Sequence, residues 1–478
     1  MMNKKIKFEL LVLVLLPIPS IAQVQTLVPG VNVKGSYNDN ISLARNNGNK
    51  QDDFIIEVNP YIAYRRDSKG LKLNVDYQLQ TLTYTDQSEN NDIFHQFKAD
   101  VDANIAKDIF FIKAAAQYGQ SVIDPTSDVF FDNQTLTNNR TDVTTANINP
   151  YAVFRTGRFA KMTLGVDSGV VRYKTNTLND SDRTRYNIDI TNGPDFNTID
   201  WNVYYNKDDI DTKKEADTTY EKAGAGIGYK LNRKVSLLLN TGIEKHEYQR
   251  AVGSEDPDGA DWNAGFAWTP NSRTRLELRT GERFFGKTGE AHFTIKGKRL
   301  NVAANYKEDV ITSTITEFER SVFRITDPFG RPVFDADGNP ELIELDKPIS
   351  SSETFIRKRL SGDVGWKSAK SHMGFSVYDE QRLYQQSTER EDLVGISGFF
   401  NWDFALRTKL LFNAAGQIRD FRNLNRKDGT ARVSASIERR MRRKLTGRIS
   451  LIHNRLESSN PANDYSQNIF LIGVNWKL

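Results

Sequence analysis

Apolar and polar residues alternate with a period of two along most of the chain. In residues 71–80 every odd position is apolar or aromatic and every even position is polar. The same pattern recurs around residues 97–105, 235–243, 373–377 and 431–437. Successive side chains of a β-strand point to opposite faces, so this period predicts strands with one apolar face and one polar face.

The connections between these segments alternate in length. Short turns, such as residues 67–70 and 107–108, are followed by longer polar stretches, such as residues 121–142 and 206–217. This rhythm is typical of an up-and-down outer-membrane barrel with short periplasmic turns and longer extracellular loops. The longest connection, residues 307–351, is expected to fold over the mouth of the barrel or inward as a constriction.

The chain length fixes an approximate strand number. A strand needs about 9–11 residues to cross a bilayer. At about 21 residues per strand and connection, residues 23–478 predict a single domain of about 22 strands, within a range of roughly 16–24. The bilayer core offers no hydrogen-bond partners, so the strands must close on themselves. The predicted fold is all-β, a closed antiparallel transmembrane β-barrel.

The first residues resemble a secretory signal peptide. Residues 1–22 contain lysines near the start, an apolar run, and small residues before the expected cleavage between Ala22 and Gln23. The apolar run is shorter than the roughly 20 residues that a membrane helix needs. The pattern therefore predicts export rather than anchoring, and a location in the outer membrane of a Gram-negative bacterium.

Average composition alone would indicate an ordinary soluble protein. The chain is 38% hydrophobic and 26% charged, its mean hydropathy is −0.57, and it has no cysteine. Alternation explains this average, because a barrel combines a lipid-facing apolar stripe with a polar stripe that faces a wet lumen. The absence of cysteine excludes both disulfides and a thiol site.

Alternation also predicts which charged side chains point into the lumen. The candidates are Lys409, Arg419, Arg432 and Arg448 on C-terminal strands, and Asp76, Asp100 and Asp102 on N-terminal strands. One interpretation is a pore with a basic wall that attracts anions or anionic polymers. The other is that inward charges of opposite sign pair across neighbouring strands.

No catalytic or cofactor motif is evident in the sequence. The five histidines are far apart, and Gly224, Gly226 and Gly228 lie inside a strand pattern without the helix that a phosphate loop requires. The basic stretch at 439–444 is predicted to be a solvated hairpin turn, which argues against nucleic-acid binding. We therefore expect no enzymatic activity, no cofactor, no metal and no nucleic-acid partner.

The chain ends on a strict apolar stripe. The stripe comprises Phe470, Ile472, Val474, Trp476 and Leu478. These residues are predicted to be the lipid face of the last strand. They also resemble the C-terminal signal that barrel-assembly machinery recognises, although that signal usually ends in an aromatic residue and this chain ends in Leu478.

Several stretches resemble one family of barrels. The first are YNDNISL at 37–43, DDFIIEVNPYIAYRRDSKGLKLNVDYQLQTLTY, and NNDIFHQFKADVDANIAKDIFFIKAAAQY. The later ones are VFRITDPFGRPVFDADGNPELIELD and FIRKRLSGDVGWKSAKSHMGFSVYDEQR. In this order they resemble the PEP-CTERM/exosortase-associated outer-membrane β-barrel proteins, which are grouped with β-barrel porins. The resemblance implies a bacterial outer-membrane barrel linked with exopolysaccharide production and export.

Three functions remain open from the sequence. The first is a pore or accessory for extracellular polysaccharide export, and the second is a general diffusion porin for small solutes. The third is a non-conducting structural barrel that binds surface polymers or proteins. The expected partners are outer-membrane lipid, lipopolysaccharide, the barrel-assembly machinery, and polysaccharide or polysaccharide-export components.

Overall fold

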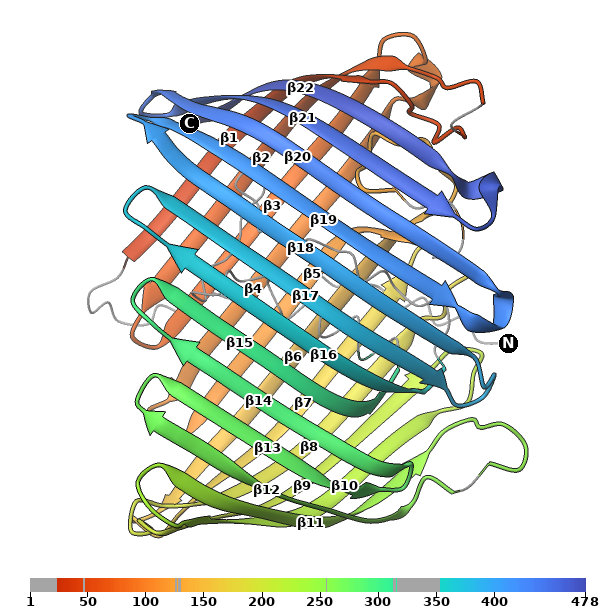
Figure 1. The fold of residues 1–478 in the computed structure, drawn as a ribbon. Coiled ribbons are helices and arrows are strands. Elements are labelled where there is room, and N and C mark those ends of the chain that lie inside the picture. Colours follow the sequence, from red (N-terminus) through yellow and green to blue (C-terminus); the bar gives the residue numbers. More distant parts are fainter. Residues whose placement is uncertain are drawn as a thin grey trace, which may run out of the picture.

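The described residues form one closed antiparallel barrel. The computed structural model describes residues 24–45, 48–124, 127, 130–254, 256–312, 315 and 353–478. Within these ranges 22 strands form a single sheet (Figure 1). The sheet closes because the first strand, β1 (Val24–Asn38), pairs with the last, β22 (Tyr465–Lys477), along residues 30–38 and 469–477. The predicted fold and the strand number of about 22 are confirmed.

Each of the other strands pairs with its neighbours in chain order. Their bounds are β2 (Asp53–Ser68), β3 (Leu71–Tyr84), β4 (Asp92–Ala106), β5 (Phe110–Val122), β6 (Arg140–Thr156), β7 (Ala160–Tyr173), β8 (Ser181–Asn192), β9 (Ile199–Thr212), β10 (Thr218–Lys230), β11 (Val235–Glu247), β12 (Gly259–Asn271), β13 (Thr274–Arg283), β14 (Gly286–Lys296), β15 (Leu300–Ile311), β16 (Phe355–Lys367), β17 (Ser371–Tyr384), β18 (Arg390–Ala405), β19 (Thr408–Phe421), β20 (Arg426–Arg442) and β21 (Leu445–Ser458). Short 3-10 helices occur at η1 (Ser88–Asn90), η2 (Arg422–Leu424) and η3 (Pro461–Asn463). Among the described residues, no helix is both long enough and apolar enough to cross a membrane.

The two ends of the barrel differ in their connections. At one end, ten turns of two to six residues join the strands, and the C-terminal end of β22 lies there too (Figure 1). At the other end, six of the eleven connections contain seven or more residues. We call these the short-turn end and the long-loop end. In outer-membrane barrels they correspond to the periplasmic and extracellular sides.

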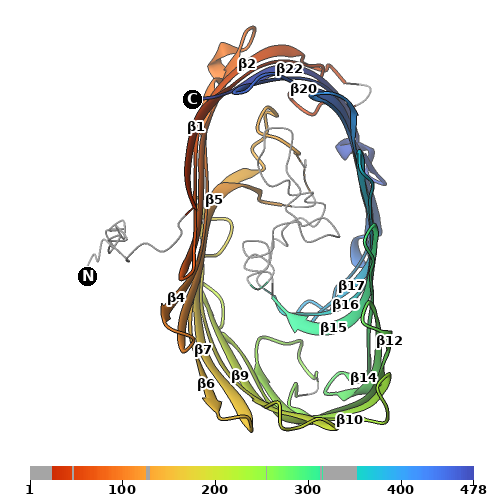
Figure 2. The ribbon, with the colours of Figure 1, turned by 90° about the vertical axis from the view of Figure 1, so that its left-hand side faces the viewer.

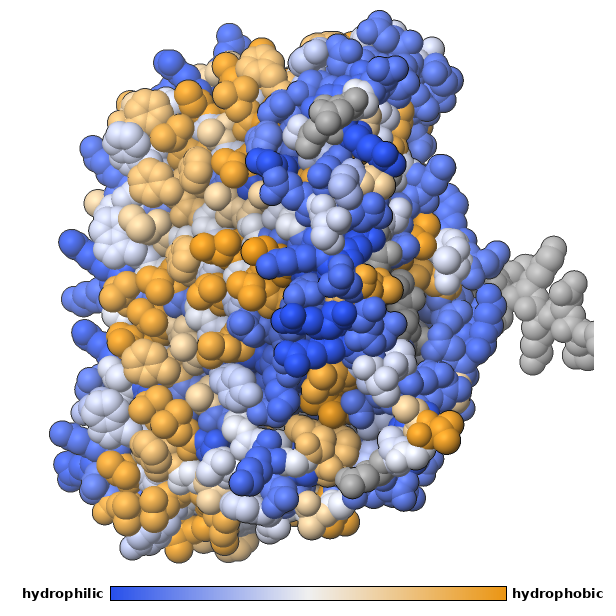
Figure 3. All heavy atoms as spheres, turned by 45° about the vertical axis from the view of Figure 1, so that its right-hand side comes forward, coloured by the Kyte–Doolittle hydropathy of each residue, from blue (hydrophilic) through white to orange (hydrophobic). Residues whose placement is uncertain are grey.

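Apolar side chains cover the outside of the barrel. On β11, Leu239 and Ile243 are 52% and 66% exposed, whereas Glu244 and His246 on the opposite face are 3% and 6% exposed. Figure 3 shows such residues as a broad apolar band, with hydrophilic surface on both sides of it. A continuous apolar surface of this size is stable only against lipid, so the barrel spans a membrane and crosses it with each strand.

The last strand places its apolar stripe outward. Its five apolar positions are between 37% and 58% exposed: Phe470, Ile472, Val474, Trp476 and Leu478. The intervening Asn475 points inward, where its side chain bonds to Asn32 and accepts a hydrogen bond from the Tyr61 hydroxyl at 3.1 Å. Recognition of this stripe by assembly machinery stays a prediction.

The strand before the long connection is longer than the sequence predicts. The long connection was expected from residue 307, but β15 extends through Ile311, because Asp309 lies opposite Arg357 and Val310 opposite Ile356 in the ladder. An ion pair of 3.7 Å between Asp309 and Arg357 supports this extension. Apart from Thr312 and Ile315, the rest of the predicted 307–351 loop lies outside the described residues. The same holds for the predicted signal peptide, including Ala22 and Gln23.

A closed barrel of this kind predicts heat-modifiable mobility in gel electrophoresis. Because the hydrogen-bonded ring has no free edge from which to unzip, the folded protein is expected to survive detergent without heating. The unboiled sample should migrate differently from the boiled one. Identical migration of the two samples would contradict closure.

Candidate functional site

The predicted acidic residues lie on the inner face of the N-terminal strands. Asp76 on β3 pairs with Arg65 on β2 at 2.5 Å. Asp102 on β4 lies opposite Lys72 in the ladder with β3 and opposite Lys113 in the ladder with β5. Asp100 lies one inward position further along β4. Acidic and basic side chains therefore alternate between neighbouring strands on this wall.

The predicted basic residues lie on the inner face of β19 to β21. Arg419 binds both carboxylate oxygens of Glu391 on β18, at 2.9 and 2.8 Å. Arg448 on β21 donates to Glu438 on β20 at 2.6 Å. Lys409 is exposed near the short-turn end. Arg419 and Arg448 thus pair across strands, as the second interpretation of the charges proposed, rather than lining an uncompensated basic wall.

Arg432 has a different role, because it binds a segment inside the lumen. Its guanidinium donates to the Phe131 carbonyl oxygen at 3.3 Å and lies over the Phe131 ring. Residues 130–139 between β5 and β6 turn into the barrel and lie against its inner wall (Figure 2). We call residues 130–139 the docked segment. The sequence predicted an extracellular loop at 121–142, so this placement corrects that prediction.

Apolar contacts anchor the docked segment at two points. Phe131 packs against an inner-wall cluster from the long-loop end: Leu43, Leu456 and Tyr465. Leu136 packs against a second cluster: Ile41, Ile55, Leu82, Tyr84 and Phe94. Both clusters lie within the barrel, where apolar side chains have no lipid to face. Burying Phe131 and Leu136 there favours docking through the hydrophobic effect.

Polar contacts complete the docking between these anchors. Gln134 donates to Glu57 at 2.7 Å, and its carbonyl accepts from the Tyr84 hydroxyl at 2.8 Å. Asn133 donates to Gln80 at 2.9 Å. These partners come from β2 and β3, more than 45 residues away in the sequence. The docked segment is therefore fixed by tertiary contacts and narrows the lumen beside the N- and C-terminal strands.

Electrostatics at the docked segment centre on Asp132. Burial raises the pKa of the Asp132 carboxyl, while the nearby charges of Arg432 and Arg140 act in the opposite direction. Arg140 also donates to the carbonyl oxygens of Asn133 and Thr135. The two arginines thus offset part of the cost of burying this carboxylate.

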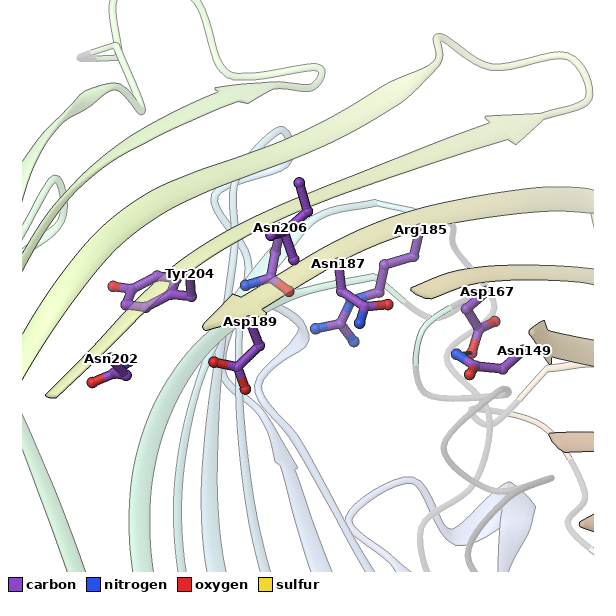
Figure 4. A pocket seen from close by; sticks show the side chains of 9 residues that line it. Asn149, Asp167, Arg185, Asn187, Asp189, Asn202, Tyr204 and Asn206 are labelled. Atoms are coloured by element: carbon purple, nitrogen blue, oxygen red, sulfur yellow. Dashed lines mark hydrogen bonds between the residues drawn. The ribbon is translucent and has the colours of Figure 1, made fainter. Parts of the chain in front are cut away.

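A polar cavity lies in a different part of the inner wall. It has a volume of about 490 Å³ and is formed mainly by inward-facing residues of four consecutive strands, β6 to β9 (Figure 4). Its lining is Asn149, Asp167, Arg185, Asn187, Ile188, Asp189, Asn202, Tyr204 and Asn206. Figure 4 shows Arg185, Asn187 and Asp189 along one strand, with Asn202, Tyr204 and Asn206 along the next. We call this site the β6–β9 pocket.

Most polar groups of the β6–β9 pocket are available to a ligand. Asn149 donates to Asp167 at 3.4 Å. Within the described part of the chain, the side chains of the other polar lining residues form no internal hydrogen bond: Arg185, Asn187, Asp189, Asn202, Tyr204 and Asn206. A concave site with several convergent donors and acceptors is the usual form of a ligand site.

Glycines on β10 make room for this pocket. A Cβ atom at Gly224 would lie 2.5 Å from the Tyr204 hydroxyl oxygen, and one at Gly226 would collide with the Asn202 side chain. The glycines thus leave the space that the Tyr204 and Asn202 side chains occupy. Their position inside β10 agrees with the sequence interpretation of close packing in a strand.

Neither the docked segment nor the β6–β9 pocket is predicted by the alternation and charge patterns of the sequence. One available signal was Phe130, Phe131 and Leu136 in an otherwise polar connection. The other was amide and carboxylate side chains at alternate positions of two adjacent strands, such as Asn187 and Asp189. Among the described residues, no group of three or more histidine, aspartate or glutamate side chains is placed to hold a metal ion.

Comparisons with known proteins do not assign this chain to a family. No protein-family model matches the sequence, and no curated protein is similar to it in sequence. Among solved structures, the FrpB iron transporter from Neisseria meningitidis (F3-3 variant) is similar, with 8% identity, a TM-score of 0.49, and coverage of 94% of this chain and 82% of that one. The siderophore receptor PirA from Pseudomonas aeruginosa gives 7% identity, a TM-score of 0.43, and coverage of 95% and 81%. OccAB3 from Acinetobacter baumannii gives 8% identity, a TM-score of 0.35, and coverage of 95% and 99%. The fold assignment rests on the strand pairing, not on these weak similarities.

Proposed function

We propose that this protein is an outer-membrane channel of a Gram-negative bacterium through which extracellular polysaccharide passes. The β6–β9 pocket is the observation that carries the proposal. Apart from Asn149 and Asp167, its lumen-facing polar side chains form no side-chain hydrogen bond with any described residue. The sequence resemblance to exosortase-associated barrels supports the same assignment.

The chemistry of the pocket suits sugars. Sugar hydroxyls both donate and accept hydrogen bonds, and an asparagine side chain offers one donor group and one acceptor atom. Tyr204 adds an aromatic face for the apolar side of a sugar ring and a hydroxyl for its edge. Because the pocket is open to the lumen and spread over four strands, it fits units of a passing polymer better than a buried small molecule.

Replacing Tyr204 with alanine is expected to weaken the interaction of oligosaccharides with the channel by roughly tenfold, since an aromatic contact and a hydrogen bond are both lost. The measurement is block of single-channel conductance in planar bilayers by neutral malto-oligosaccharides. Ser397→Ala, a lumen-facing change on β18 away from the pocket, is the control and should leave block unchanged.

Other outcomes would favour the alternatives. Steady conductance that no oligosaccharide blocks would indicate a general diffusion porin. Absence of any conductance from correctly folded protein would indicate a structural barrel. If malto-oligosaccharides block the wild-type and Tyr204→Ala channels equally, the β6–β9 pocket is not their binding site.

A further inference from the structure

The short-turn end of the barrel carries a strong excess of positive charge. Its ten turns contain twelve basic residues: Lys69, Lys107, Arg158, Arg233, Lys234, Arg273, Lys298, Arg299, Lys370, Arg407, Arg443 and Lys444. They contain two acids, Asp108 and Asp195, and Asp195 pairs with Arg158 at 2.8 Å. Among the described residues of the eleven connections at the long-loop end, 14 acidic residues outnumber 7 basic ones. The two ends therefore have opposite charge.

Three further basic residues, at strand ends next to these turns, face the mouth of the lumen. Arg440 on β20 pairs with Thr446 on β21, which in turn pairs with Asn475 on β22. The Asn475 side chain points inward, so Arg440 points inward as well. Lys477 is the next inward position on β22, and Lys409 is level with Glu438 and Arg448 on the inner face. All three basic residues are exposed. The adjacent Arg439 is level with Val474 of the lipid-facing stripe and points the other way.

We propose that the short-turn mouth is a docking site for an anionic polysaccharide, one that carries carboxylate or phosphate groups. We call the inward-facing Lys409, Arg440 and Lys477 the mouth cations. Like charges clustered at a low-dielectric rim concentrate polymer of opposite charge and raise its rate of capture. The acidic long-loop end repels the same polymer, which favours its release there. Anionic lipid headgroups would instead be met by outward residues such as Arg439.

This inference rests on the proposed function and narrows its substrate class. The test uses full-length protein in nanodiscs of zwitterionic lipid and measures binding of fluorescent oligogalacturonate, with a neutral malto-oligosaccharide of equal length for comparison. The wild type should bind the oligogalacturonate, and binding should weaken as salt is raised. Lys409→Glu/Arg440→Glu/Lys477→Glu should weaken binding by roughly tenfold or more, and Arg440→Glu alone by less.

The matched control is Arg439→Glu, the same charge reversal one residue away on the lipid side. It should bind oligogalacturonate as the wild type does. An equal loss in Arg439→Glu, equal binding of the neutral oligosaccharide at the mouth, or no binding of oligogalacturonate by the wild type would each overturn the inference. Heat-modifiable gel mobility shows whether each variant is folded. If the triple variant does not fold, the test is whether Arg440→Glu weakens oligogalacturonate binding more than Arg439→Glu does.

The two proposals fail separately. If the wild type does not bind oligogalacturonate, but malto-oligosaccharides still block its conductance in a way that depends on Tyr204, the protein is a channel for neutral polysaccharide. Docking at the mouth without conductance would leave an anion-binding barrel that does not transport.

Discussion

Replacing Ile396 with arginine is expected to lower the free energy of unfolding of the barrel in lipid by about 2–4 kcal/mol. Ile396 lies near the middle of β18, 50% exposed on the outer face and level with Val377 of β17. A guanidinium at this depth must either lose its hydration or distort the bilayer to reach water. The measurement is equilibrium unfolding by guanidinium chloride of protein folded into lipid vesicles.

The adjacent residue provides the control. Ser397 points into the lumen, level with Ser376 and Asp363, which bond to each other at 2.7 Å. An arginine at position 397 stays hydrated beside a carboxylate, so Ser397→Arg should change the unfolding free energy by less than about 1 kcal/mol. Equal effects at the two positions would show that the two faces of β18 have been assigned wrongly.

Replacing Leu136 with aspartate is expected to release the docked segment and raise single-channel conductance, by roughly twofold or more if the open cross-section sets the current. Leu136 fills an apolar cluster on the inner wall, and its backbone N–H donates to the Ile41 carbonyl at 2.7 Å. A carboxylate placed among Ile41, Ile55 and Leu82 would be buried without a partner, which costs more than docking can supply. Conductance in planar bilayers measures the change.

Asn138→Asp adds the same charge to the same segment at an exposed position. It should retain the wild-type conductance, so any difference between the two variants reflects undocking rather than charge in the lumen. Unchanged conductance in Leu136→Asp would show that the docked segment does not limit the current.

The docked segment and the β6–β9 pocket occupy different walls. The segment contacts residues of β2 to β4 and of β20 to β22, and none of its contacts described above involves a residue that lines the pocket. A 22-stranded barrel is wide enough to hold elements inside its lumen. Narrowing one side of the lumen would direct a polymer toward the remaining wall, which includes the sugar-compatible β6–β9 pocket.

The sequence by itself determined the barrel. Alternation is local, because each residue of a strand faces either lipid or water whatever its partners are, so Leu71–Gln80 and the closing stripe from Phe470 to Leu478 could be read directly. Chain length then set the number of strands. The inward direction of Arg419 and Arg448 follows from the same period, although their carboxylate partners do not.

Only the tertiary structure decided what fills and lines the lumen. Phe131 meets Arg432 some 300 positions away, and Thr135 meets Gln467 across 332 positions, so no local pattern could place residues 130–139 inside the barrel. The β6–β9 pocket likewise depends on the register of four strands and on the space left by Gly224 and Gly226. A period of two shows which residues of a strand face water. A binding site needs water-facing residues from several strands close together, and their proximity depends on barrel closure and strand register.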